Sequence, residues 1–96
     1  MREPILHFRE PFTDQIAFEV ALKGWYTGVT VELPDHSRWP VAFYDPTRVA
    51  HELEISGQHG EPFLAEHNMI IVPEVTEANM RAAVNALFLQ GWFSAE

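Results

Sequence analysis

Residues 68–93 read NMIIVPEVTEANMRAAVNALFLQGWF, and this stretch predicts a strand, a turn and a capped amphipathic helix. The apolar run within 68–73 is typical of a strand that is covered on both faces, so we expect it at the centre of a sheet. Thr76 is the expected N-cap of a helix over 77–90. The apolar residues of that helix recur at i, i+4, i+7 and i+8, which predicts one buried stripe. They are Met80, Val84, Leu87 and Phe88.

The end of this helix is also specified by the sequence. Gly91 stands where a helix commonly closes with a residue in the left-handed conformation. The apolar residue after such a glycine usually packs back onto the last turn. We therefore expect Trp92 to fold onto its own helix near Leu87, with Phe93 beside it.

Residues 15–23, QIAFEVALK, alternate strictly between large apolar residues and smaller or polar ones. Alternation with a period of two is the signature of a half-buried strand, so we expect a strand here. A short helix is the alternative, because Thr13 or Asp14 is a suitable N-cap and Gly24 a suitable end. The strand is preferred because the large apolar side chains would be spread all around a helix. They are Ile16, Phe18, Val20 and Leu22.

Two further strands are predicted near 28–33 and 39–44, where apolar and polar residues alternate again. Residues 24–28 and 34–38 have the Gly, Pro, Asp and Ser content of turns. Strands joined by short turns form an antiparallel meander. Residues 1–14 contain two prolines around a short apolar run, which fits either an edge strand or an extended segment.

Asp45-Pro46 is a helix start signal and predicts a short helix near 46–55, although its alternation also permits a strand. Residues 56–67 form the longest irregular segment, and such loops in compact domains are usually functional or mobile. The predicted fold is α+β: a three- to four-stranded, mostly antiparallel sheet with the two helices packed on one face. The length of 96 residues corresponds to a single domain over 1–96.

Composition narrows the classes of function. The chain is 47% apolar and 21% charged, as in ordinary globular proteins, and contains no cysteine. The absence of disulfides favours a cytoplasmic protein. No apolar run approaches the ~18 residues of a membrane span, and residues 1–12 lack the apolar core of a signal peptide. Nucleic-acid binding is not expected, because the six basic residues are scattered and the net charge is −8.

The acidic residues are concentrated in 45–77. This segment contains seven carboxylates and one basic residue, which gives a local charge of −6. We therefore expect a non-enzymatic interaction module that binds a protein partner or associates with itself. It would act as an acidic inhibitor or antitoxin-like protein that covers a basic surface, or dimerise through an edge strand or the C-terminal helix. Neither a catalytic residue nor a cofactor is expected. The predicted interaction residues are Trp25, Tyr26, Trp39, Glu52 and Glu54, because aromatic side chains at turns are enriched at interfaces.

A metal-binding protein or small enzyme is the alternative hypothesis. Three histidines lie among glutamates in 51–67, and imidazole and carboxylate groups are ligands of zinc. The predicted ligands are His51, His59 and His67, with Glu54, Glu61 and Glu66 nearby. The segment HELE is not HExxH, because it lacks the second histidine one helical turn later. The spacing of His51, His59 and His67 also matches no metal motif that we can justify.

Overall fold

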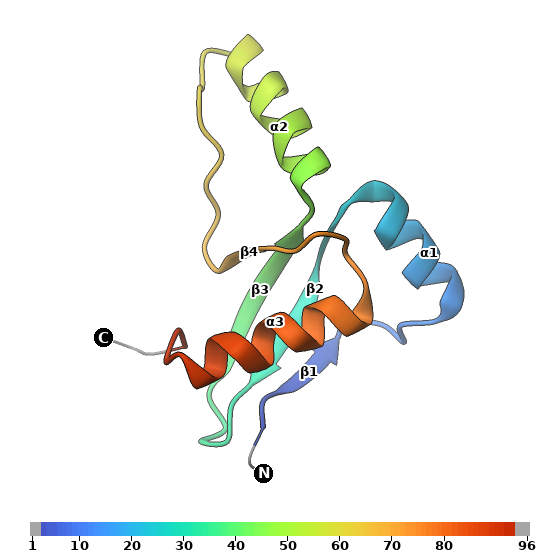
Figure 1. The fold of residues 1–96 in the computed structure, drawn as a ribbon, viewed down its shortest axis with the longest axis vertical. Coiled ribbons are helices and arrows are strands. Elements are labelled where there is room, and N and C mark those ends of the chain that lie inside the picture. Colours follow the sequence, from blue (N-terminus) through green and yellow to red (C-terminus); the bar gives the residue numbers. More distant parts are fainter. Residues whose placement is uncertain (1–2, 94–96) are drawn as a thin grey trace.

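The computed structural model describes residues 3–93, which form four strands and three helices (Figure 1). In chain order these are β1 (Ile5–Phe8), α1 (Asp14–Lys23), β2 (Trp25–Glu32), β3 (Arg38–Tyr44), α2 (Pro46–Gln58), β4 (Met69–Ile71) and α3 (Glu77–Leu89). No helix within the described residues is long and apolar enough to span a bilayer.

The four strands form one sheet in the order β1-β2-β3-β4. The first three pair antiparallel, whereas β4 lies parallel to β3. A parallel neighbour requires a crossover connection, which α2 and the segment after it provide. The expected α+β fold with a mostly antiparallel sheet is confirmed.

The core lies on one face of this sheet, beneath α3 (Figure 1). Alternate residues of β2 and β3, including Val31 and Phe43, point into it. Met80 and Val84 of α3 are fully buried against them, which confirms the predicted stripe. Within residues 3–93, no helix lies across the opposite face of the sheet as α3 does, and we call that face the open face.

The predicted strand at 15–23 is wrong, because this segment is the helix α1. The Thr13 hydroxyl accepts a hydrogen bond from the Ile16 amide at 3.2 Å, and Gly24 closes the helix in the left-handed conformation, with φ of 78°. These caps prevail over the alternation, and β1 occupies the strand position beside β2. The cost is visible on the surface, where Phe18 and Leu22 remain 70% and 78% exposed.

The prediction that the 68–73 strand is central is also wrong. The strand β4 has only three residues and lies at the edge of the sheet, and Ile71 is 53% exposed. Among the described residues no further strand pairs with it. An apolar run indicates burial in general, but it does not tell a sheet centre from an edge that is covered on one face.

Two boundaries differ from the prediction for local reasons. The strand β2 begins at Trp25, so the expected turn at 24–28 is reduced to Gly24. The pairing shifts register between Tyr26 and Val29, so the glycine pattern marks a bulge within the strand instead of a turn. The helix at 46–55 is confirmed and continues to Gln58. The expectation that it packs on the face of the sheet beside the C-terminal helix is wrong, because none of its residues is buried and it projects beyond the sheet (Figure 1).

The helix α3 and its two ends form as predicted, whereas the packing of the Trp92 ring against Leu87 stays a prediction. The Thr76 hydroxyl accepts from the Asn79 amide, and Gly91 has a φ of 76°. The Trp92 amide donates to the Leu87 carbonyl at 3.0 Å, which is the bond that defines this type of helix end. Phe93 is buried.

Candidate functional site

The most unusual part of the fold is α2, which projects beyond the sheet together with the segment that returns to β4 (Figure 1). We call α2 and residues 59–68 the arm. The helix starts well, since the Asp45 carboxylate accepts from the Arg48 amide at 2.7 Å and Pro46 occupies the first turn. None of its 13 residues is buried.

Side chains on the open face hold the base of the arm. The guanidinium of Arg48 lies over the Trp25 ring, 5.6 Å from its centre, and forms an ion pair with Glu52 at 2.5 Å. The hydroxyl of Tyr44, at the end of β3, donates to Glu66 of the returning segment. Both limbs of the arm are therefore attached to the sheet at its base.

The Tyr44 contact predicts an alkaline transition. Burial, with the hydrogen bond to the Glu66 carboxylate, raises the pKa of Tyr44 to about 12. The fold thus favours the protonated phenol, so this stabilisation is complete below the ordinary pKa of about 10 and is lost as the pH rises to about 12. We expect phenolate absorbance to show this late titration. It disappears in Tyr44→Phe, and in Glu66→Gln it moves only partly towards pH 10 because burial is the larger cause.

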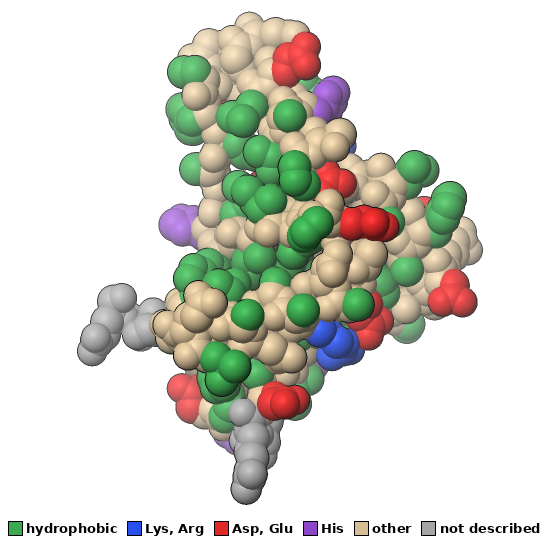
Figure 2. Space-filling model, in the orientation of Figure 1, with side chains coloured by type: hydrophobic (Ala, Val, Ile, Leu, Met, Phe, Trp, Pro, Cys, Tyr) green, Lys and Arg blue, Asp and Glu red, His purple; other side chains and the backbone are tan. Residues whose placement is uncertain are grey.

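The arm carries both exposed apolar side chains and acidic side chains. Figure 2 shows hydrophobic side chains along the arm and between it and α3. The exposed large ones on the arm are Leu53, Ile55 and Phe63. Residues 46–67 carry four glutamates against Arg48, so the local charge is −3 with neutral histidines.

The predicted interaction residues do not form one surface. Trp25 and Tyr26 are consecutive in β2 and therefore point to opposite faces of the sheet. Trp25 lies beneath Arg48 on the open face. Trp39 packs edge-on against Phe93, with ring centres 6.0 Å apart. Glu52 and Glu54 both lie on α2.

Tyr26 lies in an aromatic cluster with Phe8 and Phe12. Its hydroxyl is buried and has no hydrogen-bond partner among the described residues. Burial, together with the nearby Glu10 carboxylate, raises the pKa of Tyr26 above its ordinary value. The Tyr26 ring thus packs against the core, and its role in binding stays a prediction.

The three predicted metal ligands all lie on the arm and are exposed: His51 on α2, His59 just after it and His67 near the return to β4. Within residues 3–93, no group of three metal-ligating side chains is placed to hold an ion. The metal hypothesis stays a prediction, which metal analysis of the purified protein tests.

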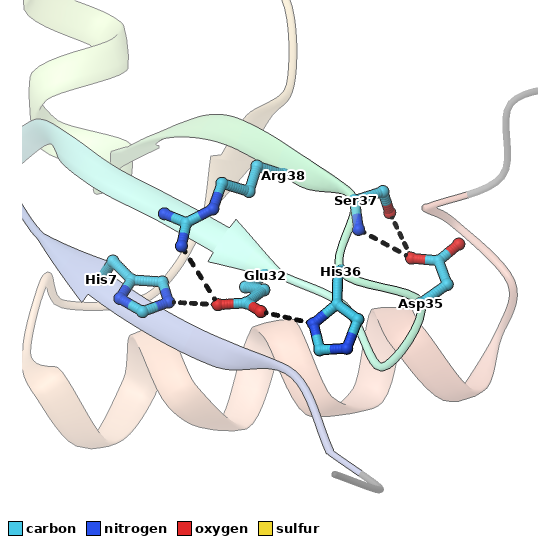
Figure 3. A network of polar contacts seen from close by, with 6 residues as sticks. All are labelled: His7, Glu32, Asp35, His36, Ser37 and Arg38. Atoms are coloured by element: carbon cyan, nitrogen blue, oxygen red, sulfur yellow. Dashed lines mark hydrogen bonds and ion pairs between the residues drawn. The ribbon is translucent and has the colours of Figure 1, made fainter.

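Sequence reasoning missed a polar cluster on the open face, at the β2–β3 hairpin (Figure 3). The carboxylate of Glu32 accepts from His7 at 2.8 Å, from His36 at 3.0 Å and from Arg38 at 3.3 Å. We call these four residues the Glu32 cluster. Only the pairing of β1 with β2 brings His7 to Glu32, and the mistaken strand at 15–23 concealed that pairing.

The electrostatics of this cluster follow from its contacts. The hydrogen bonds from His36 and His7, assisted by the charge of Arg38, lower the pKa of Glu32 below its usual range. Glu32 thus stays ionised at neutral pH. The contacts of ionised Glu32 stabilise the fold fully above the ordinary carboxyl pKa. This stabilisation is lost as the pH falls through the lowered pKa of Glu32.

Comparison with protein-family models, with curated proteins and with solved structures found no match to this chain.

Proposed function

We propose that this domain is a protein-interaction module that binds its partner through the arm. The observation that carries the proposal is that α2 buries none of its residues. A helix of this length is marginal in water, because its stability comes mainly from packing one face against other elements. Within residues 3–93, α2 makes little of this packing, which is typical of a helix that packs against a partner protein.

The chemistry of the arm indicates what the partner presents. Leu53 and Ile55 of α2 are 39% and 38% exposed, and Phe63 of the returning segment is 60% exposed. Apolar side chains at the centre of an interface supply most of the binding energy, while a charged rim steers association. The surrounding glutamates favour a basic surface that contains an apolar patch.

The partner can be identified by photo-crosslinking. A photoreactive residue at position 55 or 63 is expected to capture a protein whose contact surface is basic. The matched control places the same residue at position 89, because Leu89 is 83% exposed but lies on α3, outside the arm. Equal capture from position 89 contradicts binding through the arm.

Affinity for the purified partner gives the quantitative prediction. We expect Leu53→Asn and Ile55→Asn each to weaken binding about tenfold or more, because truncation of an interface anchor costs over ~1–2 kcal/mol. Both side chains are partly exposed, so stability changes little. Leu89→Asn is expected to bind normally. Affinity is also expected to fall as salt is added, since the complementary charges are screened.

Self-association is the second form of this function, with a second copy as the partner. The C-terminal aromatic residues are less available for it, because Phe93 is buried against Trp39 and contacts Trp92. Light scattering from micromolar to millimolar protein distinguishes the two forms. Dimerisation that Ile55→Asn abolishes assigns the arm to a second copy. If the protein is strictly monomeric over this range, the partner of the arm is a different protein.

A further inference from the structure

A second surface with a different chemistry lies on the open face of the sheet. Here a hollow of about 270 Å³ runs over the central strand β2. His7 and Arg9 line it from the β1 side, and Arg38 and Pro40 line it from β3. We call it the cationic trough.

Strand register explains why these side chains meet. His7 pairs with Thr30, and Thr30 pairs with Pro40, so these three residues form one row across the sheet. The Arg9 amide donates to the Gly28 carbonyl at 2.8 Å, which places Arg9 beside the next part of β2. Small residues of β2 thus form the floor between longer side chains on both sides.

The charge of the trough contrasts with that of the chain. Arg9 and Arg38 are two of only six basic residues in a protein of net charge −8. None of the described residues that line the trough carries a carboxylate. Glu32 lies at its end and partly neutralises Arg38, through one contact of 3.3 Å.

Glu32 also orients the side chains of His7 and Arg38, while most N–H donors of Arg38 remain free to bind an anion. It fixes the imidazole of His7 at 2.8 Å, and the guanidinium of Arg38 extends over β2 towards His7 (Figure 3). A guanidinium has five N–H donors, and Glu32 contacts a single nitrogen of Arg38. The side chain of Arg38 is still 58% exposed, so its other donors are accessible from the trough.

We propose that the cationic trough binds a small oxyanion, a phosphate or carboxylate group, between Arg9 and Arg38. Guanidinium groups recognise both anions through paired, charge-assisted hydrogen bonds. The hydroxyl of Thr30 supplies a further donor between them. The hollow is slightly smaller than the ~300–1,000 Å³ of drug-sized sites, which suits a small anion.

The test is an NMR titration of the full chain with inorganic phosphate and, separately, with succinate, each at constant ionic strength. We expect saturable shifts at Thr30, Arg38 and the His7 ring. Arg9→Gln and Arg38→Gln are expected to weaken the binding about tenfold each, since each removes a charge-assisted contact. Saturation by one probe only assigns the anion as phosphate or as carboxylate.

Arg81→Gln is the matched control, because Arg81 lies on α3 and pairs with Glu77 at 2.9 Å. It is expected to bind both anions like the unmodified protein. Shifts that rise without saturation, or saturation that survives in both trough variants, overturn the proposal. The trough shares no residue with the arm, so this result is independent of the arm's partner.

Discussion

Replacement of Gly24 by alanine is expected to lower the free energy of unfolding by about 2–3 kcal/mol. Gly24 has a φ of 78°, where a Cβ atom costs ~1–2 kcal/mol. That Cβ would also lie 2.6 Å from a carboxylate oxygen of Asp45, the residue that caps α2. Displacing a cap costs ~1 kcal/mol more. Equilibrium unfolding in urea measures the change.

Gly60→Ala is the matched control for this prediction. Its φ of 80° is nearly the same, but a Cβ there meets nothing within 4 Å. Only the conformational penalty applies, so we expect a loss of about 1–2 kcal/mol, which is about 1 kcal/mol less than at Gly24. Gly24→Ala is also expected to accelerate hydrogen exchange of the Arg48 amide, which Asp45 holds. Equal losses at the two glycines would show that Asp45 moves aside freely.

Phe93→Ala is expected to cost about 3 kcal/mol, the lower end of the range for a buried phenylalanine, because Phe93 lies outside the helices and strands, where the backbone relaxes more easily. Phe93 is only 7% exposed and packs against Trp39 and Trp92. The prediction tests whether the C-terminal aromatic residues belong to the core. Urea unfolding again gives the free energy.

Substitutions at two nearby positions serve as comparisons for Phe93→Ala. Leu89→Ala removes an apolar side chain that is 83% exposed and is expected to change stability by less than ~0.5 kcal/mol. Trp92→Ala, at 40% exposure, is expected to fall between the two. A loss at Phe93 no larger than that at Leu89 would place the C-terminal aromatic residues outside the core.

Units whose signals act over a few residues could be predicted from the amino-acid sequence. Thr76, the stripe from Met80 to Phe88 and Gly91 specify α3 from its first turn to its last. Asp45 with Pro46 specifies the start of α2. Caps and helical spacing involve neighbours within about one turn, so they are readable without knowledge of the fold. The acidity of the arm could likewise be predicted from the sequence, because it is a property of composition.

Tertiary structure alone decided how these units are placed. In the segment 15–23 the caps favour a helix, whereas the alternation favours a strand. The segment forms the helix α1, because β1 pairs with β2 in its place. The Glu32 cluster and the cationic trough join residues of β1, β2 and β3 that lie far apart in the chain. Whether α2 packs on the sheet or projects from it likewise depends on the rest of the chain. Strand pairing and packing of this kind depend on long-range contacts that compete for the same edges and faces, and no local pattern records which contact wins.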